Sequence, residues 1–390
     1  MEHAARSRGR PQEGPRRSFS LFNTKVGSVD LTFLILVLLL LTIGLIMLFS
    51  ASYAYAYYNR GNSYTFISNQ LFYAVLGSVL MMLVSTIDYK ILYRLAWPAM
   101  MLTYMLLVAV LFFPKQKGAR RWINLGFITF QPSEIAKFAI VILFAYMICR
   151  SYDRMKTFRH GILPFAGVLG VIVVLMMLEP HLSGTILILA IGSIMMIVGG
   201  ANMKWFLAAA VAGIALLAVI VMIPGVIGYA ASRLEYWIDP WSDPQGKGFQ
   251  TIQSLYAIGS GGLMGLGIGN SRQKYLYLPE PQNDFIFSIV CEELGFVGAA
   301  LIILLFALLV WRGFVIGMRC KDRFGSLVAV GLTAQVGIQA ILNIMVVTNT
   351  IPNTGISLPF FSYGGTSLVM LLCQMGVVLA ISRQTTLEKL

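Results

Sequence analysis

Apolar segments long enough, or nearly long enough, to cross a lipid bilayer constrain this chain more than any other feature. The ten segments lie near residues 31–51, 67–86, 92–113, 134–150, 161–178, 185–199, 205–223, 285–311, 326–347 and 364–382. A spanning helix needs about 20 mostly apolar residues. Of the 390 residues, 58% are hydrophobic and only 12% are charged, whereas a soluble domain has about 25% charged residues. The sequence therefore predicts an all-α polytopic membrane protein with ten transmembrane helices, and it argues against a soluble enzyme or a disordered protein.

The distribution of positive charge predicts the orientation. With the N-terminus in the cytoplasm, nineteen of the 29 Lys and Arg residues fall on cytoplasmic segments, as the positive-inside rule requires. Both termini are then cytoplasmic. We expect a disordered basic arm at 1–28, a membrane domain at 29–384 and a short tail at 385–390. The net charge of +13 is thus no evidence for nucleic-acid binding.

Two exterior loops are unusual. Residues 114–133 carry four cations, and residues 224–284, between helices 7 and 8, form by far the largest loop. A loop of this length is usually functional or disordered. Because its aromatic residues include Trp237, Trp241, Tyr256, Tyr275 and Tyr277, we expect it to fold against the membrane face.

Acidic residues mark the start of helix 8. Asp284 directly precedes the apolar run, where the helix dipole favours an ionised carboxylate; a simple N-cap is the alternative. Glu292 and Glu293 follow roughly 12–14 Å further along the helix. Carboxylates inside the membrane are functional candidates, although a structural pair with a polar neighbour is equally open.

The first exterior loop carries a cationic cluster, and an opposite-charge pair follows it. The cluster could bind a phosphate or pyrophosphate, or anionic lipid headgroups. Its members are Lys115, Lys117, Arg120 and Arg121. Glu134 and Lys137 are three residues apart on helix 4, so they share a face; such a pair is more often structural than catalytic.

Two further segments should interrupt regular helix. Residues 259–269 contain six glycines, which predicts a tight turn or a re-entrant segment and only weakly an anion-binding turn. Residues 352–367 combine two Pro with three Gly, which is typical of a re-entrant element lining a cavity. His181, in the turn between helices 5 and 6, is expected to be structural.

Together these segments resemble the SEDS family (shape, elongation, division and sporulation), which includes FtsW, RodA and SpoVE. The motifs are KGARRWINLGF with QPSEIAK, DPQGKGFQTIQSLYAIGSGGLMGLGIGNS, LPEPQNDFIF with EELG, and ISLPFFSYGGTS. The similarity covers roughly residues 28–384, and LPFFSYGGTS with the preceding NTG is closer to the FtsW/SpoVE branch than to RodA.

The resemblance implies a peptidoglycan glycosyltransferase that polymerises lipid II into β-1,4 glycan strands at the outer face of the bacterial plasma membrane. It also implies a class B penicillin-binding protein as transpeptidase partner, other division or elongation proteins, and a position at the division septum. The essential acid of the family matches Asp284, its Arg-Trp pair matches Arg121 and Trp122, and its helix 4 pair matches Glu134 and Lys137. Its EELG acids match Glu292 and Glu293. The turn EPHLSGT departs from the family pattern, because His181 replaces an acid.

The resemblance also implies a chemical role for the candidate site residues. Asp284 is expected to act as general base on the acceptor hydroxyl, with undecaprenyl pyrophosphate as leaving group. Cations, or a divalent metal ion such as Mg²⁺ or Mn²⁺, would stabilise the diphosphate; no organic cofactor is expected. The candidate substrate-binding residues are Arg121, Arg120, Lys117, Arg272, Lys274, Gln273, Glu280 and Ser362.

Two other functions stay open from the sequence. A lipid II flippase would use the intramembrane charges of Glu134, Lys137, Glu292 and Glu293 for alternating access. A scaffold that recruits a cell-wall synthase would not need Asp284.

Overall fold

The computed structural model describes residues 27–115, 120–124, 126, 129–208, 236–246 and 248–387. Within them, eight helices are long and apolar enough to cross a membrane, and α6 is a shorter apolar helix. The helices are α1 (Leu31–Arg60), α2 (Thr65–Val84), α3 (Ile91–Val110), α4 (Pro132–Ser151), α5 (Leu163–Leu178), α6 (Leu182–Val198), α9 (Phe249–Gly261), α10 (Ile286–Arg319), α11 (Arg323–Val347) and α12 (Gly365–Leu387). The all-α membrane fold is therefore confirmed. The predicted seventh span at 205–223 lies mainly outside the described residues, as do Lys117 and nearly all of the basic arm.

Short non-helical elements connect these helices. Strands β1 (Ile123–Asn124) and β2 (Thr129–Phe130) form an antiparallel pair before α4. A 3-10 turn η1 (Tyr152–Arg154) and a π-helical turn η2 (Phe158–Ile162) lead from α4 into α5, and a 3-10 turn η3 (Pro240–Ser242) precedes α9. The predicted large loop thus contains ordered structure in its described part.

Polar contacts fix the beginning of α1. The side chain of Asp30 accepts a hydrogen bond from the backbone N–H of Phe33 at 3.0 Å, which caps the helix. The same carboxylate forms an ion pair with Arg312 of α10 at 2.7 Å, and the backbone N–H of Asp30 donates to Ser382 of α12 at 3.1 Å. One residue therefore ties three helices together.

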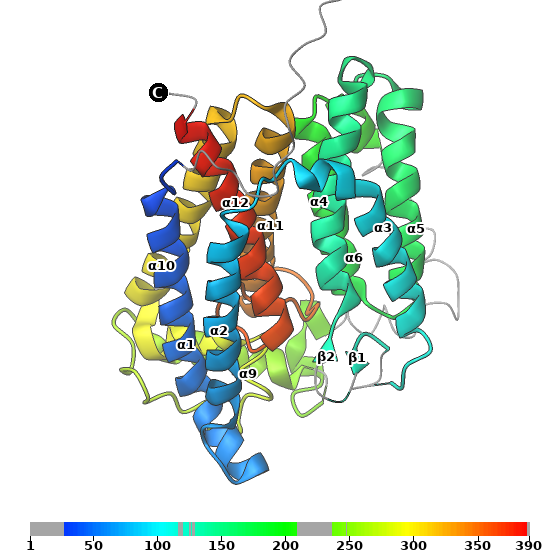
Figure 1. Ribbon diagram of the computed structural model, residues 1–390. Helices are drawn as coiled ribbons and strands as arrows, with labels where there is room; N and C mark the ends of the chain where they lie inside the picture. Colours follow the sequence, from blue (N-terminus) through cyan, green and yellow to red (C-terminus); the bar gives the residue numbers. More distant parts are fainter. Residues whose placement is uncertain are drawn as a thin grey trace, which may run out of the picture.

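Helix α11 lies at the centre of the bundle (Figure 1). Helices α1, α2, α10 and α12 pack together on one side of it, and α3, α4, α5 and α6 on the other. The start of α1 and the end of α12 lie at one end of the molecule, whereas β1, β2 and α9 lie at the opposite end. The topology of the chain in the membrane, including which end faces the cytoplasm, stays a prediction.

Helix α10 is broken at Gly295, where φ is 67° and ψ is −169°. A break leaves backbone carbonyls without their helical donors. The glycine-rich segment after α9 supplies donors, because the N–H groups of Leu266 and Gly267 bond to the carbonyls of Glu292 at 2.9 Å and Glu293 at 3.0 Å. In return, the N–H of Phe296 bonds to the Gly262 carbonyl at 2.9 Å. The segment is thus a tight turn docked onto the broken helix, and its amides serve the fold.

Candidate functional site

Asp284 lies two residues before α10, whose N-cap is Phe285, and is half-buried. Its backbone carbonyl accepts a hydrogen bond from the side-chain amide of Asn343 in α11 at 2.7 Å. Its carboxylate lies beside Gly355, where an added Cβ would come within 3.1 Å of Oδ2. Gly355 has a φ of +73°, a conformation that glycine adopts without steric cost. The backbone of Asp284 is therefore fixed by α11, and its carboxylate lies next to a glycine of the segment between α11 and α12.

Residues 349–364, between α11 and α12, form the irregular wall beside Asp284. The side-chain amide of Asn343 also donates to the Ile356 carbonyl at 2.6 Å. The hydroxyl of Ser362 donates to the Asn283 carbonyl at 2.7 Å and accepts from the backbone N–H of Leu358 at 2.8 Å. Irregular backbone at membrane depth must be satisfied by protein, and these contacts do so. The segment is irregular, as its Pro and Gly content predicts, and its entry into the membrane stays a prediction.

A buried polar chain runs from α4 to this segment. Glu134 and Lys137 form an ion pair at 2.8 Å. Lys137, which is 4% exposed, also donates to Oε1 of Gln339 at 3.1 Å. The amide of Gln339 in turn donates to the Ser357 carbonyl at 3.0 Å. The pair predicted on helix 4 is therefore connected by hydrogen bonds to the wall beside Asp284.

Arg121 lies at the same end of the molecule as Asp284, against the turn between α5 and α6. Its Nη2 donates to the carbonyl of Pro180. Two buried titratable side chains flank this proline, Glu179 with 1% exposure and His181 with 7%. The ring of His181 contacts the side-chain amide of Gln131 at 3.2 Å, just before α4. The turn therefore links Arg121 to the element that carries Glu134 and Lys137.

Both side chains in this turn are held in their neutral forms. Burial raises the pKa of Glu179 to about 8, although the nearby Arg121 charge acts in the opposite direction. Burial lowers the pKa of His181 to about 3, and the charges of Arg121 and Lys137 lower it further. The carboxylate oxygens of Glu179 have no hydrogen-bond partner. A neutral buried acid beside an arginine is the least expected feature of this end of the molecule.

Three residues predicted to bind substrate lie around the break in α10, beside Glu292 and Glu293: Arg272, Gln273 and Lys274. Lys274 is 2% exposed and pairs with Glu293 at 3.0 Å. The hydroxyl of Ser50 in α1 also donates to Glu293, at 2.6 Å. Glu292 accepts from the backbone N–H of Arg272 at 2.9 Å. These acids anchor the glycine-rich turn.

Lys274 must be corrected as a pyrophosphate ligand, because its ammonium is buried and committed to an ion pair. Arg272 is exposed and Gln273 half-buried, and both follow the same turn. They lie beside Glu292, eight residues along α10 from Asp284, which is roughly 12 Å. Their substrate contacts stay predictions.

Of the remaining residues predicted to bind substrate, some support the fold and others lie at the surface. Ser362 is buried and uses its hydroxyl to hold residues 283 and 358, so it shapes the wall. Glu280 accepts a hydrogen bond from the side chain of Asn283 at 2.8 Å. Arg120 is exposed and donates to the Leu111 carbonyl at 2.9 Å. Lys117 lies outside the described residues.

Sequence reasoning missed the polar face of α11. Gln335, Gln339 and Asn343 recur every four residues in an apolar helix, so they share one face, and all three are buried. A search for polar residues at helical spacing inside apolar runs finds them. The unusual state of Glu179 gives no comparable signal, because its cause is burial among segments distant in sequence.

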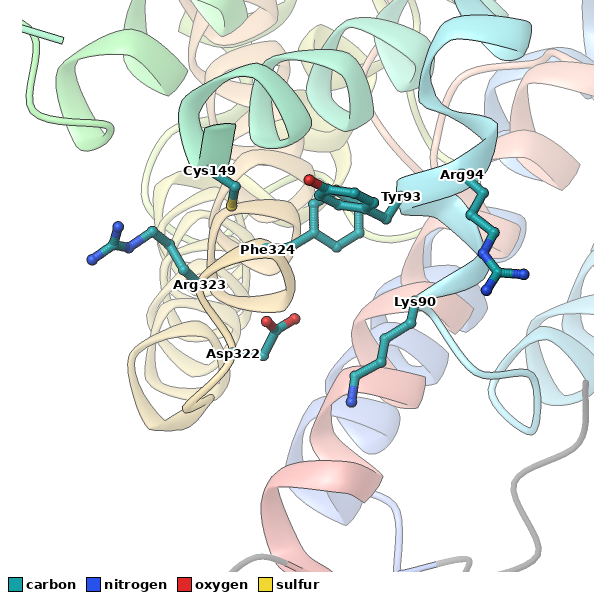
Figure 2. Close-up of a pocket in the computed structure, with 7 residues that line it drawn as sticks. All are labelled: Lys90, Tyr93, Arg94, Cys149, Asp322, Arg323 and Phe324. Atoms are coloured by element: carbon teal, nitrogen blue, oxygen red, sulfur yellow. The ribbon is translucent and has the colours of Figure 1, made fainter. Parts of the chain in front are cut away.

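A pocket of about 400 Å³ opens at the opposite end of the molecule (Figure 2). Lys90, Arg94 and Arg323 line it, but their charged groups point in different directions. The carboxylate of Asp322 between them caps α11 by accepting from the N–H of Gly325 at 3.0 Å. These side chains do not converge on a ligand. In the part of the chain that the structure describes, no three His, Cys, Asp or Glu side chains gather as metal ligands. A divalent cation at the diphosphate stays a prediction.

Comparison with known proteins places the whole membrane portion in one family. The cell cycle protein family FtsW/RodA/SpoVE matches residues 30–387. Stage V sporulation protein E of Bacillus subtilis (strain 168) is 42% identical over 84% of this chain and 89% of that protein. The probable peptidoglycan glycosyltransferase FtsW of Geobacter sp. (strain M18) is 37% identical over 82% of this chain and 88% of that protein.

Solved structures agree with the sequence relatives. The chain matches a protein from work on structural coordination of polymerization and crosslinking by a peptidoglycan synthase complex, with a TM-score of 0.75 and 28% identity over 92% of this chain and 98% of that chain. It matches the rod shape determining protein RodA of Thermus thermophilus with a TM-score of 0.67 and 26% identity, over 92% of this chain and 97% of that chain. The chain therefore belongs to the FtsW/RodA/SpoVE family.

Proposed function

We propose that this protein is a peptidoglycan glycosyltransferase that polymerises lipid II. The observation that carries the proposal is the setting of Asp284. Its backbone is fixed by Asn343, and its carboxylate lies against Gly355 in the irregular wall. The family relationship supplies the reaction class, and this carboxylate supplies the base that the reaction needs.

The proposed chemistry is one displacement. The Asp284 carboxylate takes the proton from the 4-hydroxyl of the acceptor sugar as that oxygen attacks the anomeric carbon of the donor. The new C–O bond forms while the bond to the diphosphate breaks, and its electron pair leaves with undecaprenyl diphosphate. The α-linked donor thus becomes a β-1,4 linkage. A positioned base of this kind contributes about 10²–10⁴-fold to the rate.

Charge on the leaving diphosphate needs cations at the same end of the molecule. Arg121 is the candidate best supported by position, because it lies against the α5–α6 turn near Lys137 and His181. Its guanidinium offers paired donors that match phosphate oxygens. Arg120, which is exposed, is a second candidate.

We also propose the setting in which this activity is used. A multi-pass protein of this family belongs in the bacterial plasma membrane, with the Asp284 end facing outward. A class B penicillin-binding protein would cross-link the strands it makes, and the septum is the proposed site of action.

The structure offers no specific support for the transporter alternative. The intramembrane acids are engaged inside the fold, Glu134 with Lys137 and Glu293 with Lys274.

Purified protein in proteoliposomes distinguishes the two functions. With lipid II as the only substrate, and with the cross-linking partner both present and absent, a polymerase produces glycan strands that muramidase digests. Transfer of lipid II between leaflets without strands would instead identify a transporter and overturn the proposal.

A further inference from the structure

The turn between α5 and α6 contains a buried acid that the proposed chemistry does not use. Glu179 ends α5 and is 1% exposed. Neither of its carboxylate oxygens has a hydrogen-bond partner. An ionised carboxylate in such a place would lack the pairing that buried charges require. The environment therefore favours the neutral acid.

A cation lies close to this acid. The guanidinium of Arg121 donates to the carbonyl of Pro180, the residue after Glu179, and its charge acts on Glu179. An ionised Glu179 would be attracted to this guanidinium and would repel any anion that approaches it. The protonation state of Glu179 thus controls how much of the Arg121 charge is left for a ligand.

We propose that Glu179 is a positioning residue for donor binding. In its neutral form it leaves the Arg121 charge to the diphosphate of the lipid donor, and in its ionised form it competes with that diphosphate for Arg121. This inference rests on the proposed function, because that function makes the diphosphate the ligand of Arg121.

The other titratable and charged groups around the turn are engaged within the fold or held neutral by burial. His181, from the start of α6, has a pKa lowered to about 3 by burial and stays neutral. From α4, Glu134 and Lys137 neutralise each other in an ion pair. Arg120, after α3, donates to the Leu111 carbonyl.

The pH range of the effect follows from the state of Glu179. Burial raises its pKa to about 8, so the neutral form dominates at pH 7 and the ionised form at pH 9. The diphosphate diester stays ionised over this range. If only the neutral form is competent, the apparent Kd for the donor should rise about tenfold from pH 7 to pH 9.

The test measures binding of undecaprenyl-diphospho-N-acetylglucosamine, a diphosphate diester that carries the same charge at both pH values, to the purified full-length protein in nanodiscs at pH 7 and pH 9. The wild-type protein should bind this ligand about tenfold more weakly at pH 9 than at pH 7. Glu179→Gln, which cannot ionise, should bind at both pH values as tightly as wild type does at pH 7. Glu179→Met, of similar volume, should behave the same way. Asp153→Asn removes an exposed carboxylate from η1, at the opposite end of the molecule, and should follow the wild-type pH dependence.

Two results would overturn the proposal: an unchanged wild-type Kd between the two pH values, or a Glu179→Gln protein that weakens as wild type does. Arg121→Ala should bind weakly already at pH 7; wild-type affinity in this variant would contradict Arg121 as the ligand. Because binding does not need turnover, failure of strand synthesis with intact pH-dependent binding would reject the proposed function and leave this inference standing.

Discussion

Two residues that do no chemistry hold Asp284 in place. Gly355 leaves space for its carboxylate, and Asn343 binds the carbonyl of its backbone. A base must lie within hydrogen-bond reach of the proton it removes, and small displacements lower the rate steeply. The neighbours of Asp284 should therefore affect turnover more than substrate affinity.

We expect Gly355→Ala to lower kcat at least about tenfold, equivalent to about 1.4 kcal/mol, with KM nearly unchanged. The new Cβ would lie 3.1 Å from Oδ2 of Asp284 and would also strain a backbone with φ of +73°. Gly61→Ala is the matched control, because Gly61 has φ of +68° and no atom within 4 Å of an added Cβ. Steady-state kinetics on lipid II decides; equal effects of the two substitutions on kcat would rule out the contact with Asp284.

Asn343→Ala should lower both stability and kcat. It removes two hydrogen bonds, to the carbonyls of Asp284 and Ile356, each worth about 1 kcal/mol. Gln335→Ala is the control, because it removes a buried amide two helical turns away that bonds to Gln374. Both variants should unfold at lower temperature, but only Asn343→Ala should lose activity beyond its loss of folded protein. A comparable loss of specific activity in both would contradict a positioning role.

The placement of single residues could be predicted from the sequence where their position along the chain was sufficient evidence. Asp284 precedes an apolar run, and Glu134 and Lys137 share a helix face. Lys274 could not be placed in the same way, because its partner Glu293 and the nearby Ser50 belong to other elements. Ser362 was predicted beside substrate, yet its hydroxyl holds the backbone of the wall.

At the scale of elements, the break in α10 organises the region behind Asp284. The turn after α9 supplies N–H donors to the backbone carbonyls of Glu292 and Glu293. The side-chain carboxylate of Glu293 forms an ion pair with Lys274 and accepts a hydrogen bond from Ser50. The paired acids of the EELG motif are thus structural in this fold. They set the direction in which α10 leaves Asp284.

Gly295→Ala should destabilise the protein strongly, because φ of 67° with ψ of −169° is a conformation that costs other residues about 1–3 kcal/mol. The added Cβ would also lie 2.3 Å from the backbone nitrogen of Gly265, which cannot move without disrupting the turn. Gly170→Ala, in α5 with no atom within 4 Å, should be neutral or slightly stabilising. Thermal unfolding in detergent compares them, and similar melting temperatures would contradict the account of the break.

Most elements could be predicted because their apolar length is a strong signal. Nine of the predicted spans coincide with described helices, with shifted ends such as that of α1 at Arg60. The break at Gly295 could not be predicted, because an apolar run continues through it and the donors that permit it come from residues 262–267. The irregular segment at 349–364 could be predicted from the sequence, because its Pro and Gly residues are incompatible with a continuous helix.

At the scale of the whole molecule, α11 connects the two groups of helices. Its polar face reaches α4 through Gln339 and Lys137 and the start of α10 through Asn343. The cationic region around Arg121 and the acid at Asp284 are therefore joined by a continuous set of contacts. Such a connection allows diphosphate binding on one side to be coupled to base positioning on the other.

Glycan synthesis by Asp284 variants tests the central claim most directly. Wild type, Asp284→Asn and Asp284→Ala are reconstituted at equal folded amounts with lipid II, and strand formation is followed over time. Undecaprenyl diphosphate binding is measured in parallel. The account predicts a rate loss of about 10²–10⁴-fold in both variants, with donor affinity retained within a small factor. Strand synthesis at the wild-type rate by folded Asp284→Ala would contradict the assignment of Asp284 as the base.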